Sequence, residues 1–326
     1  MRSSTARRLS LLALVALAAV SCGGSTGPSG AKASPTPTPV ATLSTAMTVA
    51  LQSGDAPQNL IFAFGSLWVA AHHAGALLRV DPVAGKVIAR IPVGVGPGSA
   101  MASGDSIWVV DYQSPALVQV NAATNKVVRT VALPANGCCQ AAITGHLVWV
   151  SSGEGDSANL DAYDTRTGAR VRRIPFLASP VFTLGKLWAD TSLGELVQID
   201  PATGAKTTTA GPSGFGFTAG SESHGLAWAS SGGGNVAGLD ATGATKVQGH
   251  RTNGEALGRG ESQVVAGPND VWLGDELGEL LRIDPTTGEA TTVAQLGATY
   301  LSLVVTPGRL WVAEFDTDRL TGFATT

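Results

Sequence analysis

The chain has 326 residues, of which 44% are hydrophobic and only 14% are charged, and its formal net charge is −3 at pH 7. This balance excludes a charge-rich disordered chain, and a weakly acidic total without a basic patch argues against nucleic acid as a partner. Glycine accounts for 41 residues without a Gly-X-Y period, which indicates many tight turns between short strands.

The first forty residues predict export followed by a flexible tether. Basic residues at 2, 7 and 8 precede an apolar run over 9–20 that is too short to span a bilayer, a pattern typical of a secretory signal. The run ends in Ala-Val-Ser-Cys-Gly at 19–23, which resembles the lipobox of bacterial lipoproteins and implies lipid attachment at Cys22. The alternative is ordinary cleavage beside an incidental cysteine. The Gly-, Ser- and Pro-rich stretch that follows predicts a disordered tether.

We therefore expect three segments: a signal peptide over 1–21, the lipidated Cys22 with its tether over 22–44, and one globular domain over 45–326. We also expect a monomer anchored to a membrane through Cys22, on its extracytoplasmic side, in the periplasm or at the cell surface.

All seven tryptophans of the chain follow one period. The steps between them are 39 to 44 residues, and the tryptophans are Trp68, Trp108, Trp149, Trp188, Trp228, Trp272 and Trp311. Similar text surrounds each, as in Gly-Ser-Leu-Trp-Val-Ala at 65–70 and Gly-Arg-Leu-Trp-Val-Ala at 308–313. A period of about 40 residues is typical of repeat architectures, so the repeat defines the structural unit.

A second motif follows most of these tryptophans and predicts a hairpin. It is Asp-Pro-Val-Ala-Gly at 81–85 and Asp-Pro-Thr-Thr-Gly at 284–288. The aspartate accepts hydrogen bonds from nearby amides, proline presets φ, and glycine takes a positive φ. With short alternating runs on both sides, each repeat holds about four strands. Radial repetition of such sheets predicts an all-β, seven-bladed β-propeller with a tryptophan packed between neighbouring blades.

The last repeat stops after its third strand, so its fourth strand must come from elsewhere. The segment at 46–51, Ala-Met-Thr-Val-Ala-Leu, precedes the first repeat and has no partner of its own. We expect this N-terminal strand to complete the last blade and remove the open edge.

The tryptophan-centred text and the Asp-x-x-Thr-Gly hairpins resemble the YVTN and virginiamycin-B-lyase-like group of seven-bladed propellers, over residues 45–326. The resemblance implies the fold, but the group mixes enzymes with non-catalytic proteins. In the lyases it implies a Mg²⁺-dependent elimination that uses His and Glu of late blades. The late blades of this chain lack a matching histidine, so no catalytic residue is transferred and the catalytic residues stay unknown.

Two sets of positions are candidates for a site at the mouth of the channel. The first lies nine residues before each tryptophan and comprises Asn59, Ser99, Gln140, Ser179, Ala219, Gln263 and Ser302. Six of these seven are polar and uncharged. They predict either a water-lined channel or a polar ring that holds a small ligand.

The second set follows the tryptophan strands and includes the candidate metal ligands His72, His73, Asp111, Asp275 and Glu314. Blades six, seven, one and two are neighbours in a closed ring, so these groups could hold a divalent cation, Mg²⁺ or Ca²⁺. The alternative is that the acids cap turns and keep the loops soluble.

Two further features are open. Cys138 and Cys139 are adjacent, and in an exported protein they form either a vicinal disulfide or two thiols. The aromatic residues Phe182, Phe215, Phe217 and Tyr300 either line an apolar wall opposite the acidic set or belong to the core.

These observations favour a lipid-anchored propeller that binds a small molecule or a protein as a scaffold. A metal-dependent lyase or lactonase at the channel mouth is the alternative, and a purely structural envelope protein is the third reading.

Overall fold

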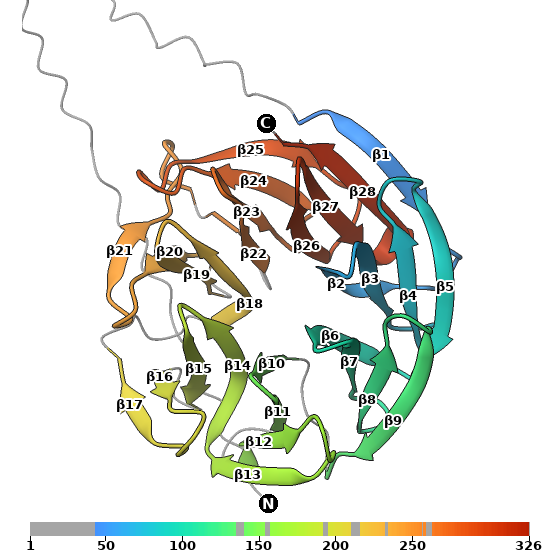
Figure 1. Ribbon diagram of the computed structural model, residues 1–326. Coiled ribbons are helices and arrows are strands. Elements are labelled where there is room, and N and C mark those ends of the chain that lie inside the picture. Colours follow the sequence, from blue (N-terminus) through green and yellow to red (C-terminus); the bar gives the residue numbers. More distant parts are fainter. Residues whose placement is uncertain are drawn as a thin grey trace, which may run out of the picture. The chain divides into compact units, whose positions relative to one another are not determined.

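The computed structural model is a ring of seven four-stranded antiparallel sheets, which confirms the predicted seven-bladed propeller (Figure 1). The compact unit comprises Val40–Thr326, within which the structure describes residues 43–134, 140–153, 157–191, 195–209, 216–231, 234–255, 257–258 and 263–325. Side chains at 216–221 lie outside this description. The described residues contain no helix that is long and apolar enough to cross a membrane.

The first four blades each use four consecutive strands, the first of them innermost. Blade 1 has β2 (Pro57–Ala63), β3 (Ser66–Ala71), β4 (Ala76–Asp81) and β5 (Lys86–Pro92). Blade 2 has β6 (Pro97–Ser103), β7 (Ser106–Asp111), β8 (Ala116–Asn121) and β9 (Lys126–Ala132). Blade 3 has β10 (Ala141–Thr144), β11 (Leu147–Ser152), β12 (Asn159–Asp164) and β13 (Arg170–Pro175). Blade 4 has β14 (Leu177–Thr183), β15 (Lys186–Thr191), β16 (Leu196–Ile199) and β17 (Lys206–Thr208).

Blades 5 and 6 follow the same plan, and blade 7 supplies only three consecutive strands. Blade 5 has β18 (Gly216–Ser223), β19 (Leu226–Ser230), β20 (Val236–Leu239) and β21 (Thr245–Gln248). Blade 6 has β22 (Gln263–Ala266), β23 (Val271–Gly274), β24 (Glu279–Ile283) and β25 (Ala290–Gln295). Blade 7 has β26 (Leu301–Thr306), β27 (Arg309–Glu314) and β28 (Arg319–Ala324), with the 3-10 turn η2 (Phe315–Thr317) before β28.

The N-terminal strand β1 (Thr45–Ala50) closes the ring, as the sequence predicts. It pairs antiparallel with β28, with Val49 opposite Leu320. Asp318 secures the chain beyond β1, because its carboxylate accepts hydrogen bonds from the amides of Gly54 and Ala56, each at 2.7 Å. Blade 7 is therefore built from both ends of the domain.

The tryptophans join the blades, because each lies on the second strand of one blade and packs into the next. Trp68 of blade 1 belongs to a cluster with Ile107 and Val118 of blade 2. Trp311 of blade 7 packs with Leu67 and Leu78 of blade 1, which continues the pattern across the closure. The same relation recurs at every blade. Because one indole fills each gap between neighbouring blades, a tryptophan about every 40 residues means that the number of tryptophans equals the number of blades.

The predicted hairpins join the third and fourth strands. In blade 1 the carboxylate of Asp81 accepts hydrogen bonds from the amides of Val83 and Ala84 at 2.8 and 2.9 Å, and Gly85 adopts φ +63°. These amides lower the pKa of Asp81. An arginine also links neighbouring blades at these turns. The Arg79 guanidinium of blade 1 donates to the carbonyl of Ala122 at 2.8 Å, in the corresponding turn of blade 2.

Candidate functional site

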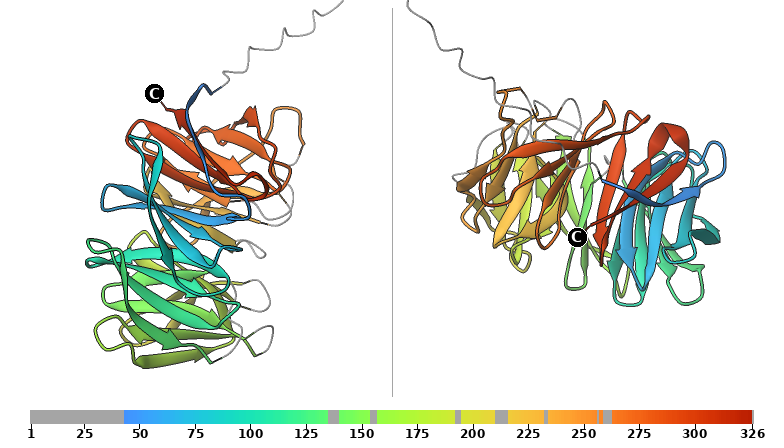
Figure 2. Two further views of the ribbon diagram at one scale, coloured as in Figure 1. Left: turned by 90° about the vertical axis from the view of Figure 1, so that its right-hand side faces the viewer. Right: turned by 90° about the horizontal axis from the view of Figure 1, so that it is seen from above.

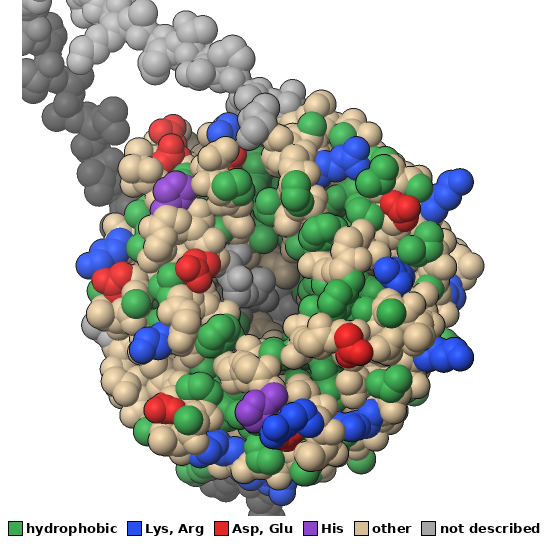
Figure 3. Space-filling view, in the orientation of Figure 1, with side chains coloured by type: hydrophobic (Ala, Val, Ile, Leu, Met, Phe, Trp, Pro, Cys, Tyr) green, Lys and Arg blue, Asp and Glu red, His purple; other side chains and the backbone are tan. Residues whose placement is uncertain are grey.

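The ring has two faces, set by its connections (Figure 2). One face, here called the turn face, carries the turns that join the first strand of each blade to the second and the third strand to the fourth. The other, here called the loop face, carries the connections that follow second strands and those that lead from blade to blade. On the face shown in Figure 3, hydrophobic side chains gather around the central hollow, while most charged side chains lie toward the rim.

The structure places four of the six predicted ring residues in the channel. Asn59, Ser99, Gln140 and Gln263 line a central cavity of about 500 Å³. Its other walls are largely apolar, formed by side chains such as Phe182. The first of the predicted aromatics therefore lies in the channel wall. The ligand role of the ring residues stays a prediction.

Three of the polar ring residues have a structural task in common. The amide of Ala100 donates to Asn59 Oδ1 at 2.9 Å, and the amide of Leu60 donates to Ser302 Oγ at 3.0 Å. The amide of Leu303 donates to Gln263 Oε1 in the same way. In each case a side chain of one inner strand satisfies an amide of the next inner strand. Ser302 is fully buried in this role and does not line the cavity.

Blade 3 breaks this pattern. In the three pairs above, the donor is the residue that follows the ring residue of the next inner strand. For Gln140 that residue is Pro180, which has no amide hydrogen. Gln140 Oε1 is buried and has no hydrogen-bond partner among the described residues. Instead the preceding residue, Ser179, donates its amide to Ser151 Oγ at 2.9 Å and adopts φ +48°. The backbone of Ser179 thus connects blades 3 and 4.

The two glutamines give a matched prediction. We expect Gln263→Met to cost about 1–3 kcal/mol of unfolding free energy, because it leaves the Leu303 amide without its acceptor. Gln140→Met should be neutral or slightly stabilising, since it removes a buried carbonyl that lacks a described partner. Urea unfolding of the two variants measures the difference. Equal costs would contradict the proposed role of the ring.

The candidate metal ligand Asp111 is committed to its own loop. This buried side chain at the end of β7 accepts hydrogen bonds from the amides of Val95 at 2.7 Å and Gly96 at 3.0 Å. The hydroxyl of Ser114 also donates to it. Burial alone would raise the pKa of Asp111, but the hydrogen bonds from Ser114, Val95 and Gly96 outweigh it and lower that pKa.

The side chains of Glu314 and Asp275 also bind partners within their own blades. Glu314, at the end of β27, is fully buried and forms an ion pair with Arg319, whose Nε lies 2.9 Å from Oε1. Thr321 adds a hydroxyl donor at 2.5 Å. Asp275 accepts the amide of Glu279 at 2.8 Å.

The structure does not bring the five predicted metal ligands together. Among the described residues, no group of three or more His, Cys, Asp or Glu side chains could hold a metal ion. The physical reason is local, because each carboxylate turns back to satisfy amides or a guanidinium of its own blade or the preceding connection. Asp111 and Asp275 accept hydrogen bonds from turn amides and Glu314 pairs with Arg319, and the metal role of these residues stays a prediction.

Aromatic rings occupy the place where the acids were expected to converge. His72, His73, Tyr112, Tyr300 and Phe315, here called the aromatic array, come from blades 1, 2 and 7. The centroids of successive rings are 5.1 to 6.1 Å apart, from Tyr112 through His72, His73 and Phe315 to Tyr300. Beside the array lies a pocket of about 460 Å³ on the loop face. Sequence reasoning weighed the histidines as metal ligands and missed this arrangement.

His72 is the buried centre of the array. Its ring stacks on Tyr112 with an interplanar angle of 20°, and Gln113 Nε2 lies 3.0 Å from its Nε2. Its Nδ1 lies 3.4 Å from the carbonyl of Pro97. An amide nitrogen can only donate, so this geometry suits a neutral ring protonated on Nδ1. Burial lowers the pKa of His72 below its usual value, against the opposing hydrogen bond to Pro97, and His73 lowers it further.

This lowered pKa predicts how stability depends on pH. The folded state binds the proton of His72 more weakly than the unfolded state, so its stabilising contribution is complete above pH about 6.5 and falls as the pH drops. We expect the unfolding midpoint in urea to decrease between pH about 7 and about 5. His72→Gln should flatten this decrease, and His73→Gln, at an exposed neighbour, should not. An unchanged slope in His72→Gln would contradict the assignment.

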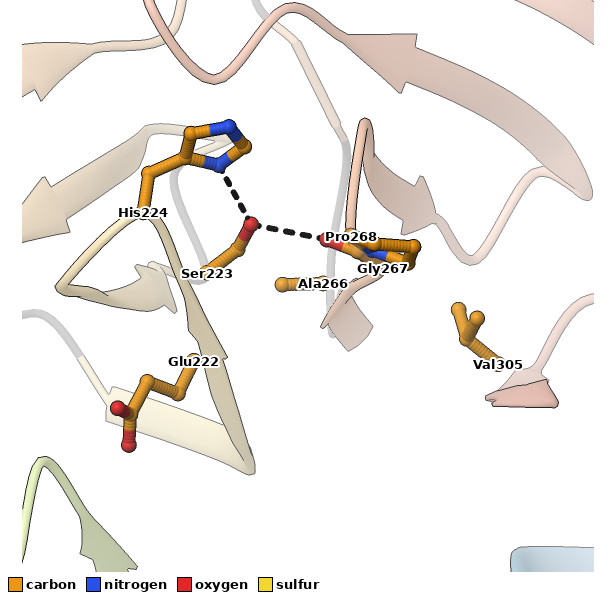
Figure 4. Close-up of a pocket in the computed structure, with 7 residues that line it drawn as sticks. All are labelled: Glu222, Ser223, His224, Ala266, Gly267, Pro268 and Val305. Carbon is orange, nitrogen blue, oxygen red and sulfur yellow. Dashed lines mark hydrogen bonds between the residues drawn. The ribbon is translucent and has the colours of Figure 1, made fainter. Parts of the chain in front are cut away.

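A second pocket, of about 470 Å³, lies on the turn face between blades 5, 6 and 7 (Figure 4). Ser223 Oγ lies 2.7 Å from His224 Nδ1 and donates to the carbonyl of Gly267 at 2.8 Å. The carboxylate that lines the same pocket, Glu222, points away from His224 and accepts the amide of Leu184 at 2.9 Å. His224 has φ +55° in the turn that joins β18 and β19. Ser223, which also contacts His224, thus links blade 5 to blade 6 through its hydrogen bond to Gly267.

Several predicted residues lie outside the described residues. These are Cys22, Cys138, Cys139 and Phe215, together with the side chains of Phe217 and Ala219. The lipidation and disulfide predictions stay predictions.

Comparison with known proteins agrees with the fold. No family model and no curated protein matches the chain. Among solved structures, hydrazine synthase of Kuenenia stuttgartiensis is similar with a TM-score of 0.66 and 14% identity, over 85% of this chain and 97% of that one. BamB from Moraxella catarrhalis is similar with a TM-score of 0.57 and 15% identity, over 87% of this chain and all of that one. At these identities the likeness shows a β-propeller scaffold.

Proposed function

We propose that this chain is an exported lipoprotein, anchored through Cys22, whose propeller binds a ligand on its loop face without transforming it. The text around Cys22 and the polar tether support the anchor. The repeat text supports a place in the YVTN and virginiamycin-B-lyase-like group. The protein acts as a monomeric binding or scaffold module on the extracytoplasmic side of a membrane.

The aromatic array carries the proposal. It presents rings from three blades beside a cavity large enough for a small molecule or a side chain of a partner protein. Aromatic rings supply binding energy through contact area and stacking, and they need no proton transfer to do so. The alternative, a metal-dependent lyase or lactonase, needs a cation, and the carboxylates of Asp111, Asp275 and Glu314 already accept hydrogen bonds from backbone amides or from Arg319.

A panel of four small probes tests the binding role. Ligand-observed NMR on the full chain would use choline as a cation, phenylacetate as an anion, cellobiose as a sugar and indole as a neutral aromatic. We expect at least one probe to bind, and Phe315→Ala to abolish that binding while Phe182→Ala, in the channel, leaves it intact. Binding that is unchanged in Phe315→Ala, or no binding by any probe, would contradict the proposal.

The anchor has a separate test. In a bacterial host that processes lipoproteins, the full chain should fractionate with membranes, and Cys22→Ala should release it to the soluble exported fraction. Membrane association that is unaffected by Cys22→Ala would refute lipid attachment at this residue.

A further inference from the structure

The pocket beside the aromatic array has a defined chemical character. Two of its walls are the rings of Phe315 and Tyr300, which meet edge to face with centroids 6.1 Å apart. Leu277, which is 53% exposed, adds an apolar side chain. The carboxylates of Asp316 and Glu276 line the same space. An aromatic corner with acidic edges therefore opens to solvent on the loop face.

The corner is held in place by the backbone and by the aspartate itself. The amide of Phe315 donates to the carbonyl of Tyr300 at 3.2 Å, which joins the 3-10 turn η2 to the segment before β26. The amide of Thr299 donates to Asp316 Oδ2 at 2.7 Å, and the hydroxyl of the same threonine also donates to that oxygen. Asp316 is thereby fixed at the pocket.

The charge around the pocket selects among ligands. The loop-face connections of blades 6, 7, 1 and 2 carry eight carboxylates in the described residues, namely Asp55, Asp111, Asp275, Glu276, Glu279, Glu314, Asp316 and Asp318. Among the described residues, three guanidinium groups reach this part of the face, those of Arg90, Arg251 and Arg319, each in an ion pair with one of these acids. The excess of negative charge attracts cations and repels anions.

Resting on the binding role proposed above, we propose that this pocket binds an organic cation, with an alkylammonium or guanidinium head in the corner of Tyr300 and Phe315 and its charge facing Asp316 and Glu276. A cation is attracted to the face of an aromatic ring by the ring quadrupole, and nearby carboxylates add to that attraction. A neutral sugar would stack on the rings but would gain nothing from the excess charge.

The decisive test compares choline with its neutral carbon analogue, in which a quaternary carbon replaces the nitrogen. The two have the same shape, so only the charge differs. With the full chain we expect choline to bind about tenfold more tightly by NMR titration, and the difference to shrink in high salt. Equal affinity would overturn the cation assignment but leave the binding role standing, because an apolar ligand would then occupy the same pocket.

Two variants locate the binding energy. Phe315→Leu keeps the apolar bulk and removes the ring, so we expect about tenfold weaker choline binding. Asp316→Asn keeps the acceptor for Thr299 and removes the charge, so we expect about threefold weaker binding. Phe182→Leu, in the channel, is the matched control and should bind choline normally. Tyr300→Leu provides a second ring variant if Phe315→Leu unfolds. Unchanged affinity in a folded ring variant would refute the proposal.

A last comparison separates the two sources of such a cation. A capped Gly-Lys-Gly peptide offers the ammonium group of a protein side chain, and butylamine offers the same group free. Tighter binding of the peptide would indicate a partner protein, and tighter binding of the amine a small metabolite. If neither the peptide nor the amine binds, the proposal is refuted.

Discussion

Removing β1 is expected to destabilise the propeller by about 4–6 kcal/mol, a large part of the stability of a typical domain. Val49 is buried in the cluster that joins blades 7 and 1, together with Trp311 and Leu320. Deletion of the strand exposes this cluster and the whole hydrogen-bonding edge of β28. Urea unfolding of a fragment of residues 52–326 against one of residues 43–326 measures the loss. Equal midpoints would refute the closure as a source of stability.

Single substitutions within β1 guard against a fragment that simply fails to fold. Val49→Asp places a charge in the buried cluster, whereas Thr48→Asp places the same charge on the exposed side of the same strand. We expect the first to lower the unfolding midpoint strongly and the second to have little effect. Similar effects for both would show that burial of β1 is not what stabilises the ring.

Removing Arg319 is the second large expected effect. Glu314 has no exposed side-chain surface, whereas its partner Arg319 is 39% exposed. Arg319→Met leaves a buried carboxylate without its cation, and we expect it to cost about 3 kcal/mol. Glu314→Gln should cost less, because the remaining guanidinium can turn to water and Thr321 keeps an acceptor.

The double variant completes this test. Arg319→Met combined with Glu314→Gln should cost less than the sum of the two single changes, because the pair then leaves together. Lys246→Met, which breaks the ion pair between a 54% exposed lysine and the 25% exposed Asp240, is the control and should change the unfolding midpoint little. A larger cost for Glu314→Gln than for Arg319→Met would contradict the explanation.

The sequence predicts the fold closely because the tryptophan of each repeat makes a contact between neighbouring blades. Each tryptophan fills a gap of the same size, so its period counts the blades, and the unpaired β1 follows from the missing strand after Trp311. The Asp-x-x-Thr-Gly text likewise encodes a local turn, whose side-chain hydrogen bonds join residues two and three positions apart. Both signals are local or strictly periodic, which is why sequence alone suffices.

The site was harder to predict because side-chain direction is not periodic. The acids that follow the tryptophan strands were expected to face one another, but Asp111 and Glu314 turn back to their own loops. A usable signal was present, since His72, Tyr112 and Phe315 all stand four residues after a tryptophan. Recognising these rings as one array required knowing that blades 7, 1 and 2 are adjacent and which way each ring points.

The construction of blade 7 from both chain ends has a consequence for how the ring could be cut. Since Thr45 lies opposite Phe323 in one sheet, a short linker between the present ends would leave a continuous circle of seven equivalent joints. The chain could then be reopened at another Asp-x-x-Thr-Gly turn without changing any contact between blades. The contacts between blades therefore determine the order of the blades around the ring, and they do not depend on where along the ring the chain begins.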